Sequence, residues 1–207
     1  MLCTLCNSTL ITQIDTHFYD CDTCKAIVKD EKHYLTATEE KTHYESHNND
    51  VEDIRYQNFT MPITQYVLDT FLPEHKGLDF GSGTGPVISS MLKKQDYDIV
   101  PYDPYFAPDQ KVLHTTYDYI VSCEVFEHFN NPKLEIDRLV SLLKPNGMLL
   151  IMTLLYTDTI DFKTWFYPKD PTHIFMYRSE TIEYIAKEKK LDILELTNRF
   201  IVLKKIG

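Results

Sequence analysis

The chain has 207 residues, of which 43% are hydrophobic and 25% are charged. This length has room for one α/β domain of about 150 residues and a small additional module. Its formal net charge of −10 argues against a broad surface for nucleic-acid phosphates, which proteins usually bind with clustered Lys and Arg. No apolar run approaches the roughly 18 residues of a membrane helix. The first residues also lack a signal-peptide pattern, so we expect a cytoplasmic protein.

Four of the five cysteines form two pairs, Cys3 with Cys6 and Cys21 with Cys24, in the spacing C-x2-C-x14-C-x2-C. In a cytoplasmic chain such pairs indicate metal ligands rather than disulfides. A closed four-cysteine zinc site would hold together residues 1–33, a zinc-ribbon-like module too small for a core of its own. The alternative is a redox-active or incidental set of thiols, which two evenly spaced pairs make a poor fit.

Residues 73–207 alternate between strand-like and helix-like stretches. This repetition predicts βαβ units, a mostly parallel sheet with helices on both faces, and right-handed crossovers. The last two strands are expected to form an antiparallel hairpin at the sheet edge. The short stretch 107–116 leaves little room for a strand and helix between the second and third apolar runs. Strands are expected at 76–80, 97–103, 117–123, 148–155, 191–196 and 199–205, helices at 86–95, 131–144 and 180–190 with Ser179 as cap, and a turn at 145–147.

The stretch "LDFGSGTGP", residues 78–86, places three glycines at alternate positions after the first expected strand. Glycine is needed where the backbone bends sharply and a ligand approaches it closely. The dinucleotide fingerprint G-x-G-x-x-G would require a third glycine at position 86, where Pro86 stands. The spacing is therefore G-x-G-x-G, preceded by Asp79. A simple tight turn without a ligand is the alternative.

This acidic residue followed by G-x-G-x-G resembles motif I of class I S-adenosylmethionine-dependent methyltransferases. The resemblance implies a Rossmann-like, doubly wound fold and a cofactor without phosphates, whose amino-acid and ribose portions pack beside the loop. The residues expected to bind S-adenosylmethionine are Asp79, Gly81, Ser82, Gly83, Gly85, Asp103, Cys123, Glu124 and Tyr44.

Asp103 lies 22 residues after Gly81, at the end of the second expected strand. An acid at this place accepts hydrogen bonds from ribose hydroxyls in Rossmann-like folds. The stretch "DPYF", residues 103–106, also imitates the D-P-P-Y signature of amino-methyltransferases. That signature belongs at the end of the fourth strand rather than the second, so we do not interpret residues 103–106 as an amino-methyltransferase site.

The stretch "YDYIVSCEVFEHF", residues 117–129, resembles the fourth-strand region of many small-molecule methyltransferases. The resemblance implies that Cys123 and Glu124 lie under the cofactor and that Glu127 and His128 begin the next turn. For Cys123 we favour a buried small apolar residue over a reactive thiol. For His128, a structural hydrogen bond and a functional role are both open.

The aromatic segment at 154–182 holds the single Trp of the chain. Class I methyltransferases generally build their substrate wall here, and "DPTHIFMY", residues 170–177, resembles a D-P-T-H-x-x-F-Y-like signature of uncharacterised methyltransferase-domain proteins. His173 is the first candidate for a base that positions or deprotonates the acceptor, with His128 second and Tyr177 as partner if it shares a turn with His173. The alternative is that Asp170, Thr172 and His173 only hold the loop together.

Residues 34–72 are expected to form a linker and lid helices, the first starting near Thr38 and the second containing Pro62. His43 and His47 lie four residues apart, which would place both on one helix face. Since no third metal ligand stands near them, we favour a lid helix that covers the cofactor or substrate through Tyr44, His47 and Asn48.

The whole chain resembles a group of bacterial methyltransferases with an N-terminal pair of cysteine knuckles. We predict methyl transfer to a small molecule, because the acidic chain shows no charged groove for a macromolecule, and a structural zinc ion at the four cysteines; no feature indicates an oligomeric state. One alternative is an RNA or protein methyltransferase that uses the module for recognition, as zinc ribbons of RNA methyltransferases do. The module's basic residues are nearly balanced by acidic ones, so nucleic acid is disfavoured. The other alternative is a fold that binds cofactor or partner without catalysis.

Overall fold

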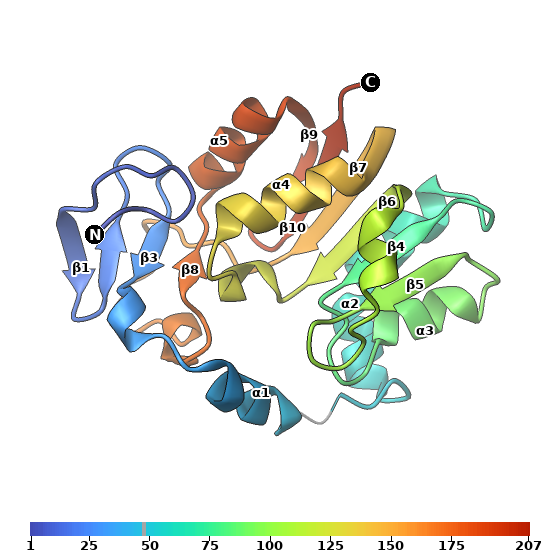
Figure 1. Cartoon of the computed structure of the whole chain (residues 1–207), viewed down its shortest axis with the longest axis horizontal. Helices are drawn as coiled ribbons and strands as arrows, with labels where there is room; N and C mark the ends of the chain where they lie inside the picture. The colour runs from blue at the N-terminus through green and yellow to red at the C-terminus, as the bar shows by residue number, and fades with distance from the viewer. Residues whose placement is uncertain (47–48) are drawn as a thin grey trace.

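Six strands form the larger of two sheets in the computed structural model, which describes residues 1–46 and 49–207 (Figure 1). In spatial order they are β5 (Ile99–Tyr102), β4 (Gly77–Phe80), β6 (Tyr117–Cys123), β7 (Leu143–Met152), β10 (Phe200–Lys205) and β9 (Leu191–Leu196). The first four strands pair in parallel, and β10 joins antiparallel to both β7 and β9. The expected mostly parallel sheet and its closing antiparallel hairpin are confirmed.

The chain passes from β5 to β6 with only a single 3₁₀ turn, η2 (Gln110–His114), between them. Strand β6 then returns to the other side of β4 and pairs with it in parallel, with Gly77 opposite Tyr119. The short connection expected at 107–116 thus removes a strand and helix from one edge and leaves β5 as the edge strand.

Helices cover both faces of this sheet, so the fold is doubly wound (Figure 1). The helices α2 (Ile54–Thr70) and α3 (Val87–Lys93) pack on one face, and α4 (Pro132–Leu142) and α5 (Ser179–Lys189) on the other. Strand alternation decides which side chain serves which face. In β6, Ile120 joins the α4 and α5 side, whereas Tyr119 and Val121 join the α2 and α3 side.

Three details of these elements differ from the sequence-based expectation. Leu134 belongs with Leu139, Leu142 and Leu143 to the amphipathic pattern of residues 131–144, which predicts that it faces the core. It is instead 53% exposed because it lies in the first turn, where Asn131 caps the helix through the Leu134 amide. Ser179 is the first residue of α5 rather than its cap. The expected turn at 145–147 is a bulge inside β7, which advances from Leu143 to Met148 while β6 advances only from Tyr117 to Tyr119.

The N-terminal residues form a second, small sheet that also includes a strand from much later in the chain, at residues 175–176. Its strands, in order, are β1 (Thr12–Asp15), β2 (Phe18–Asp20), β3 (Ile27–Lys29) and β8 (Phe175–Met176), all antiparallel. Strand β8 follows the loop that holds His173. The small sheet therefore reaches the segment that the sequence predicts as the substrate wall.

A short helix, α1 (Ala37–Glu45), links the small sheet to the rest of the chain. Its capping box starts at Thr36, two residues before the expected start, with the Glu39 carboxylate accepting the Thr36 amide at 2.8 Å. Residues His47 and Asn48, which belong to the expected lid, lie outside the described residues. None of the helices in the described part of the chain has the length and apolar character needed to cross a membrane.

Candidate active site

A cavity of about 790 Å³ opens at the carboxyl ends of β4, β5 and β6. In open α/β sheets this edge is where ligands bind, because the loops that leave neighbouring parallel strands meet there. Nine of the predicted site residues line the cavity: Tyr44, Gly81, Ser82, Gly83, Asp103, Cys123, Glu124, His128 and His173. Three others, Asp79, Gly85 and Tyr177, are not among the lining residues.

The glycine loop needs its glycines for two different reasons. Gly81 and Gly83 adopt φ angles of 79° and 63°, in the left-handed region that side chains disfavour. Gly85 has an ordinary φ, but a Cβ there would lie 1.7 Å from the Asn49 carbonyl oxygen. The loop is thus pressed between the cavity and the segment that precedes α2. Beside the loop's first turn, the Ser82 hydroxyl is buried without a hydrogen-bond partner among the described residues.

Asp103 fixes the loop to the end of β5. One carboxylate oxygen, Oδ2, accepts the Gly83 amide at 3.0 Å, and the other, Oδ1, accepts the amides of Tyr105 and Phe106 at 2.8 and 3.0 Å. Charge-assisted hydrogen bonds of this kind are stronger than neutral ones. The residue is 93% buried yet lines the cavity, so a ligand hydroxyl in that space would lie near its carboxylate.

Asp79 lies beneath the loop rather than in the cavity wall. Its Oδ2 accepts both the amide and the hydroxyl of Ser89 in α3, at 3.3 and 2.8 Å. Burial raises the pKa of Asp79 to about 6, although the Ser89 bonds act in the opposite direction. These hydrogen bonds hold α3 against β4. Asp79 does not line the cavity, so it supports the loop from below.

Cys123 and Glu124 end β6 at the cavity floor. Burial raises the pKa of the Cys123 thiol well above its usual value, so the thiol is protonated and a poor nucleophile. Glu124 has a φ of 51°, a strained conformation for this residue type. Burial, and then the neighbouring Glu127, raise the pKa of Glu124 to about 8, while Arg199 at 3.5 Å acts against this rise.

His128 and His173 both line the cavity and lie together, with ring centroids 4.7 Å apart. His128 lies in the turn η3 (Phe126–His128), as expected, and its Nδ1 lies 3.0 Å from the Thr172 carbonyl. The Nδ1 of His173 lies 2.7 Å from the Tyr167 carbonyl. Because a carbonyl only accepts, both rings carry their proton on Nδ1. Burial is the largest cause that lowers the pKa of His173 to about 4, which makes this ring a weak base.

Tyr177 does not belong to this cavity. It is fully buried, and its hydroxyl donates to the Phe126 carbonyl at 3.1 Å. The expectation that Tyr177 shares a turn with His173 is wrong, because the chain between them is extended in β8. Its position supports packing rather than contact with an acceptor.

Two site residues escaped the sequence analysis as functional candidates. Tyr167, in the turn η4 (Tyr167–Lys169), lines the cavity and donates to Glu127 Oε1 at 2.6 Å. Glu127 is fully buried and also accepts the Thr153 hydroxyl at 2.9 Å. The sequence contains a signal for Glu127, because this acid stands directly before His128 in the stretch 117–129, just after β6. Tyr167 was one of several aromatics in its segment, and the sequence did not distinguish it.

Two residues of the helix α1, Glu40 and Tyr44, line the cavity, although none of its residues is buried. The Tyr105 hydroxyl donates to Glu40 Oε2 at 3.0 Å, and the Tyr44 ring lies 5.5 Å from the ring of His128. Further along the helix, His43 Nε2 lies 3.3 Å from Asp170 Oδ2. These contacts join α1 to residues of the cavity lining.

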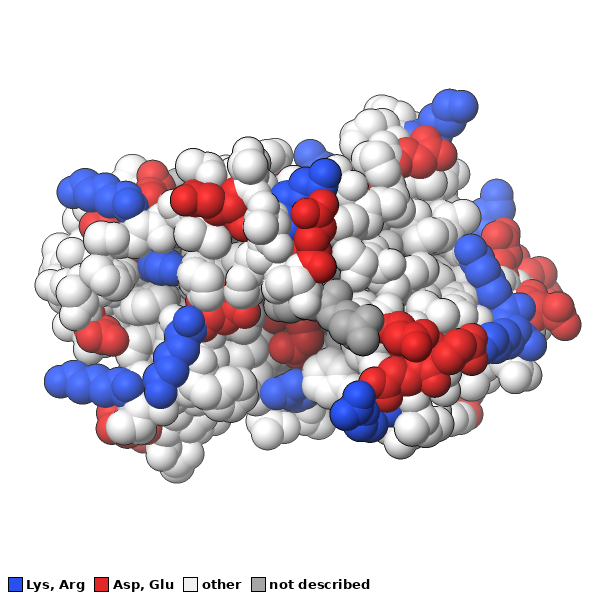
Figure 2. All heavy atoms as spheres, turned by 90° about the horizontal axis from the view of Figure 1, so that it is seen from below, with Lys and Arg blue, Asp and Glu red and all other residues white. Residues whose placement is uncertain are grey.

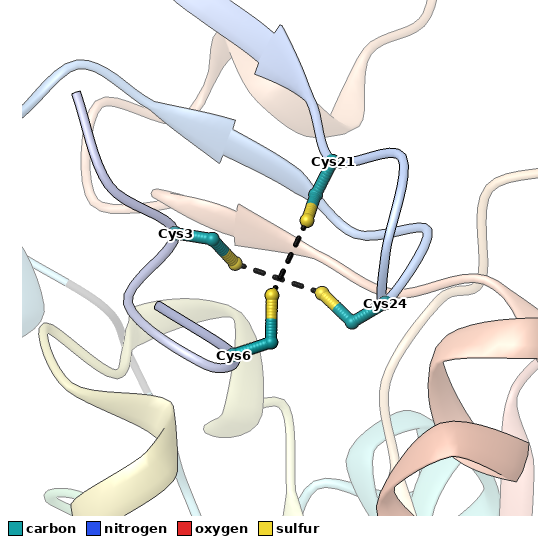
Figure 3. Close-up of side chains that lie close together, drawn as sticks. All are labelled: Cys3, Cys6, Cys21 and Cys24. Carbon is teal, nitrogen blue, oxygen red and sulfur yellow. Dashed lines mark hydrogen bonds between the residues drawn. The ribbon is translucent and has the colours of Figure 1, made fainter. Parts of the chain in front are cut away.

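The four cysteines of the module converge as a second site (Figure 3). The Sγ atoms of Cys3 and Cys24 lie 3.6 Å apart, and those of Cys6 and Cys21 lie 3.4 Å apart. Zinc–sulfur bonds of about 2.3 Å in a tetrahedron would set sulfur atoms roughly 3.8 Å apart, so the arrangement fits zinc.

The two cysteine knuckles repeat one backbone conformation. The residue after each pair, Asn7 or Lys25, has a φ of 61°. Its amide donates to the carbonyl of the first cysteine of the pair, at 2.9 Å for Cys3 and 2.8 Å for Cys21. This shared geometry turns both thiols of each pair toward one point.

Comparison with known proteins identifies the family of the chain. The family model described as "Methyltransferase domain" matches residues 52–196. The chain therefore belongs to that family, and it is a class I S-adenosylmethionine-dependent methyltransferase. No curated protein matches the chain.

Several solved structures share the fold at low sequence identity. The magnesium protoporphyrin IX methyltransferase of Synechocystis PCC 6803 with bound SAH has a TM-score of 0.57 and 14% identity, over 84% of this chain and 97% of the other. The 1,6-didemethyltoxoflavin-N1-methyltransferase of Burkholderia thailandensis has a TM-score of 0.57 and 12% identity, over 93% and 100%. A putative sarcosine dimethylglycine methyltransferase from Galdieria sulphuraria has a TM-score of 0.57 and 13% identity, over 81% and 98%.

Replacement of the buried Asp79 carboxyl should change how stability depends on pH. Because its folded-state pKa is raised, the folded protein binds this proton more tightly than the unfolded chain, and stability falls as pH rises from about 4 to about 6. We expect Asp79→Asn to raise the unfolding temperature at about pH 8 and to leave it unchanged at about pH 4. Thermal unfolding at both pH values measures this, with the exposed Asp192→Asn as control. An equal shift at both pH values would contradict the assignment.

Proposed function

We propose that the protein transfers the methyl group of S-adenosylmethionine to a small molecule bound in the cavity at the carboxyl ends of β4, β5 and β6. The observation that supports this best is that two sets of residues line one cavity: the glycine loop with Asp103, and His128, His173 and Tyr167. In this proposal the first set forms a cofactor wall and the second an acceptor wall. A cofactor on the first wall would present its methyl group to an acceptor on the second.

The cofactor wall offers the groups that an adenosyl cofactor needs. Gly81 and Gly83 allow the backbone to approach closely, and Asp103 supplies an acceptor for ribose hydroxyls. Glu124 Oε1 is buried and makes no hydrogen bond among the described residues, with Arg199 as its ion-pair neighbour at 3.5 Å, and we expect it to accept from a donor on the cofactor. Asp79 would act indirectly by holding α3 beneath the loop.

The chemistry itself asks mainly for alignment, because the sulfonium already makes the methyl carbon electrophilic. The acceptor atom forms a bond to that carbon while the sulfur–methyl bond breaks and leaves its electron pair on sulfur. An enzyme accelerates this step by holding the acceptor in line at near-attack distance and by excluding water. We expect His128 and His173 to contact the acceptor, and α1 to close over it.

A small acceptor fits the cavity better than a nucleic acid does. A volume of about 790 Å³ lies in the usual range of about 300–1,000 Å³ for small-molecule sites. On the face in Figure 2, acidic side chains gather beside the grey residues and Lys and Arg are scattered, which gives phosphates no continuous basic track. The structural neighbours named for magnesium protoporphyrin IX and 1,6-didemethyltoxoflavin agree with this choice. We further propose that the protein is cytoplasmic.

The cysteine module, in this proposal, binds structural zinc and positions the acceptor wall. Strand β3 pairs with β8, with Val28 opposite Phe175. Lys29 donates its backbone amide to the Ile174 carbonyl and its Nζ to the Pro171 carbonyl, both at 2.8 Å. These contacts bracket His173 on both sides, so the fold of the module sets the position of this ring.

Cofactor binding tests the first part of the proposal. We expect S-adenosylmethionine and S-adenosylhomocysteine to bind at micromolar concentrations in calorimetric titrations. Asp103→Ala should weaken both by roughly 10- to 100-fold, as the loss of a charged hydrogen bond of about 1.5–3 kcal/mol implies. The exposed Asp192→Ala serves as control. Failure of the wild-type protein to bind either compound would contradict the proposal, and unchanged affinity in Asp103→Ala would contradict the role of that carboxylate.

Methyl transfer from radiolabelled S-adenosylmethionine tests the acceptor class. Metabolite, RNA and protein fractions of a cell extract are each incubated with the protein and then separated. We expect label in the metabolite fraction with the wild-type protein and little with Asp103→Ala, because the variant holds the cofactor poorly. Label confined to RNA or protein would favour the macromolecular alternative.

Zinc content tests the module. We expect one zinc per chain in the purified protein, retained in Cys123→Ser and lost in Cys21→Ser, because only the latter removes a ligand. Cys21→Ser should also lower the unfolding temperature, since a structural zinc site contributes to folding directly. Elemental analysis and thermal unfolding measure both effects. Retention of zinc in Cys21→Ser would contradict the assignment.

A further inference from the structure

Glu127, His128 and His173 form a cluster that the methyl-transfer chemistry alone does not require. One ligand atom from each lies within 4.8 Å of the others. Glu127 Oε1 lies 3.9 Å from His128 Nε2 and 4.0 Å from His173 Nε2. These separations are too long for hydrogen bonds, which end near 3.2 Å, so the three atoms meet without bonding to one another.

The hydrogen bonds at Nδ1 of each histidine ring determine whether Nε2, the nitrogen that faces Glu127, can act as a metal ligand. Both rings direct Nδ1–H to a backbone carbonyl, His128 to Thr172 and His173 to Tyr167. In a neutral imidazole the other nitrogen, Nε2, then carries a lone pair. This arrangement is the one that metal-binding histidines almost always show, because it fixes the tautomer and directs the ligand nitrogen.

The carboxylate is prepared in the same way. Tyr167 donates to Glu127 Oε1 at 2.6 Å and Thr153 donates to Oε2 at 2.9 Å, which holds the side chain in one orientation. Glu127 is fully buried, and Glu124 lies beside it, so two carboxyl groups share a site with Arg199 as the neighbouring cation, 3.5 Å from Glu124. The two carboxyl groups together offer more acceptor oxygens than the neighbouring donors can satisfy. A metal ion would therefore stabilise the buried Glu127 carboxylate strongly.

We propose that Glu127, His128 and His173 bind a divalent transition-metal ion in the acceptor half of the cavity. Bonds of about 2.0–2.2 Å would draw each nitrogen–oxygen pair together by roughly half an ångström, which side-chain adjustment can supply. Two imidazoles and one carboxylate leave coordination positions open, as catalytic sites require. The cluster is separate from the four-cysteine site in both ligands and place.

The open coordination positions of the metal ion indicate which class of acceptor would bind. This inference rests on the proposed function. His128 and His173 line the cavity, so a bound ion would meet the acceptor there. The ligand it would take is an oxygen donor, a hydroxyl with a second oxygen close enough to chelate. Coordination lowers the pKa of the hydroxyl. Its proton passes to water, and the resulting oxygen anion bonds to the methyl carbon as sulfur departs.

Binding of Mn²⁺ alone tests the site without any methyl transfer. The full-length protein with its cysteine site loaded with zinc is titrated with Mn²⁺, and free Mn²⁺ is followed by electron paramagnetic resonance. We expect one Mn²⁺ per chain, and at least tenfold weaker binding in His173→Ala and in His128→Gln. The exposed His114→Ala should bind as the wild type does. Zn²⁺ is titrated in the same way by calorimetry.

The outcomes separate the two proposals. The metal site is overturned if neither ion binds beyond the cysteine site at millimolar concentration, or if both cavity variants bind as the wild type does. His128→Gln keeps the test valid if His173→Ala does not fold, because His128 is partly exposed. If the protein binds S-adenosylhomocysteine but does not bind Mn²⁺, the metal site is contradicted and the proposed function stands. If it binds Mn²⁺ but neither S-adenosylmethionine nor S-adenosylhomocysteine, the proposed function is contradicted and the metal site stands.

Discussion

The hydrogen bonds of the Asp103 carboxylate are the interaction on which the arrangement of the site depends. They tie the amide of Gly83, after β4, to the turn that begins at the end of β5. Both loops leave parallel strands at the same edge of the sheet, where the Gly81 and Ser82 amides also donate to the Tyr102 carbonyl at 2.8 and 3.0 Å. A cavity of cofactor size remains open because the carboxylate holds its two borders in place.

A second connection lies at Glu127 and organises the acceptor wall. Its side chain accepts hydrogen bonds from Tyr167 and Thr153, and its carbonyl accepts the amide of Ile174 at 2.9 Å. Segments after β6, after β7 and before β8 therefore meet at one buried residue. The cysteine module reinforces this meeting point from outside through β3 and β8. A module that looks peripheral in sequence thus helps to position the segment that holds His173.

Sequence reasoning predicted the parts of this protein that depend on local pattern. The glycine loop, the alternation of strands and helices and the paired cysteines each have a short-range signature, and the fold that they imply is the one observed. It failed where a residue's role depends on distant partners. Tyr177 resembles a site residue beside His173, but pairing of β8 with β3 extends the chain and places Tyr177 in the core. Tyr167 and Glu127 gain their roles from contact across 40 residues, which no local pattern reveals.

The central claim is that this one cavity holds the cofactor between the glycine loop and the ends of β5 and β6. A crystal structure of the protein with S-adenosylhomocysteine measures it most directly. The account predicts the ribose hydroxyls within hydrogen-bonding distance of Asp103 and the sulfur directed toward His128 and His173. An adenosyl group bound elsewhere, with the cavity filled by the protein's own side chains, would contradict it.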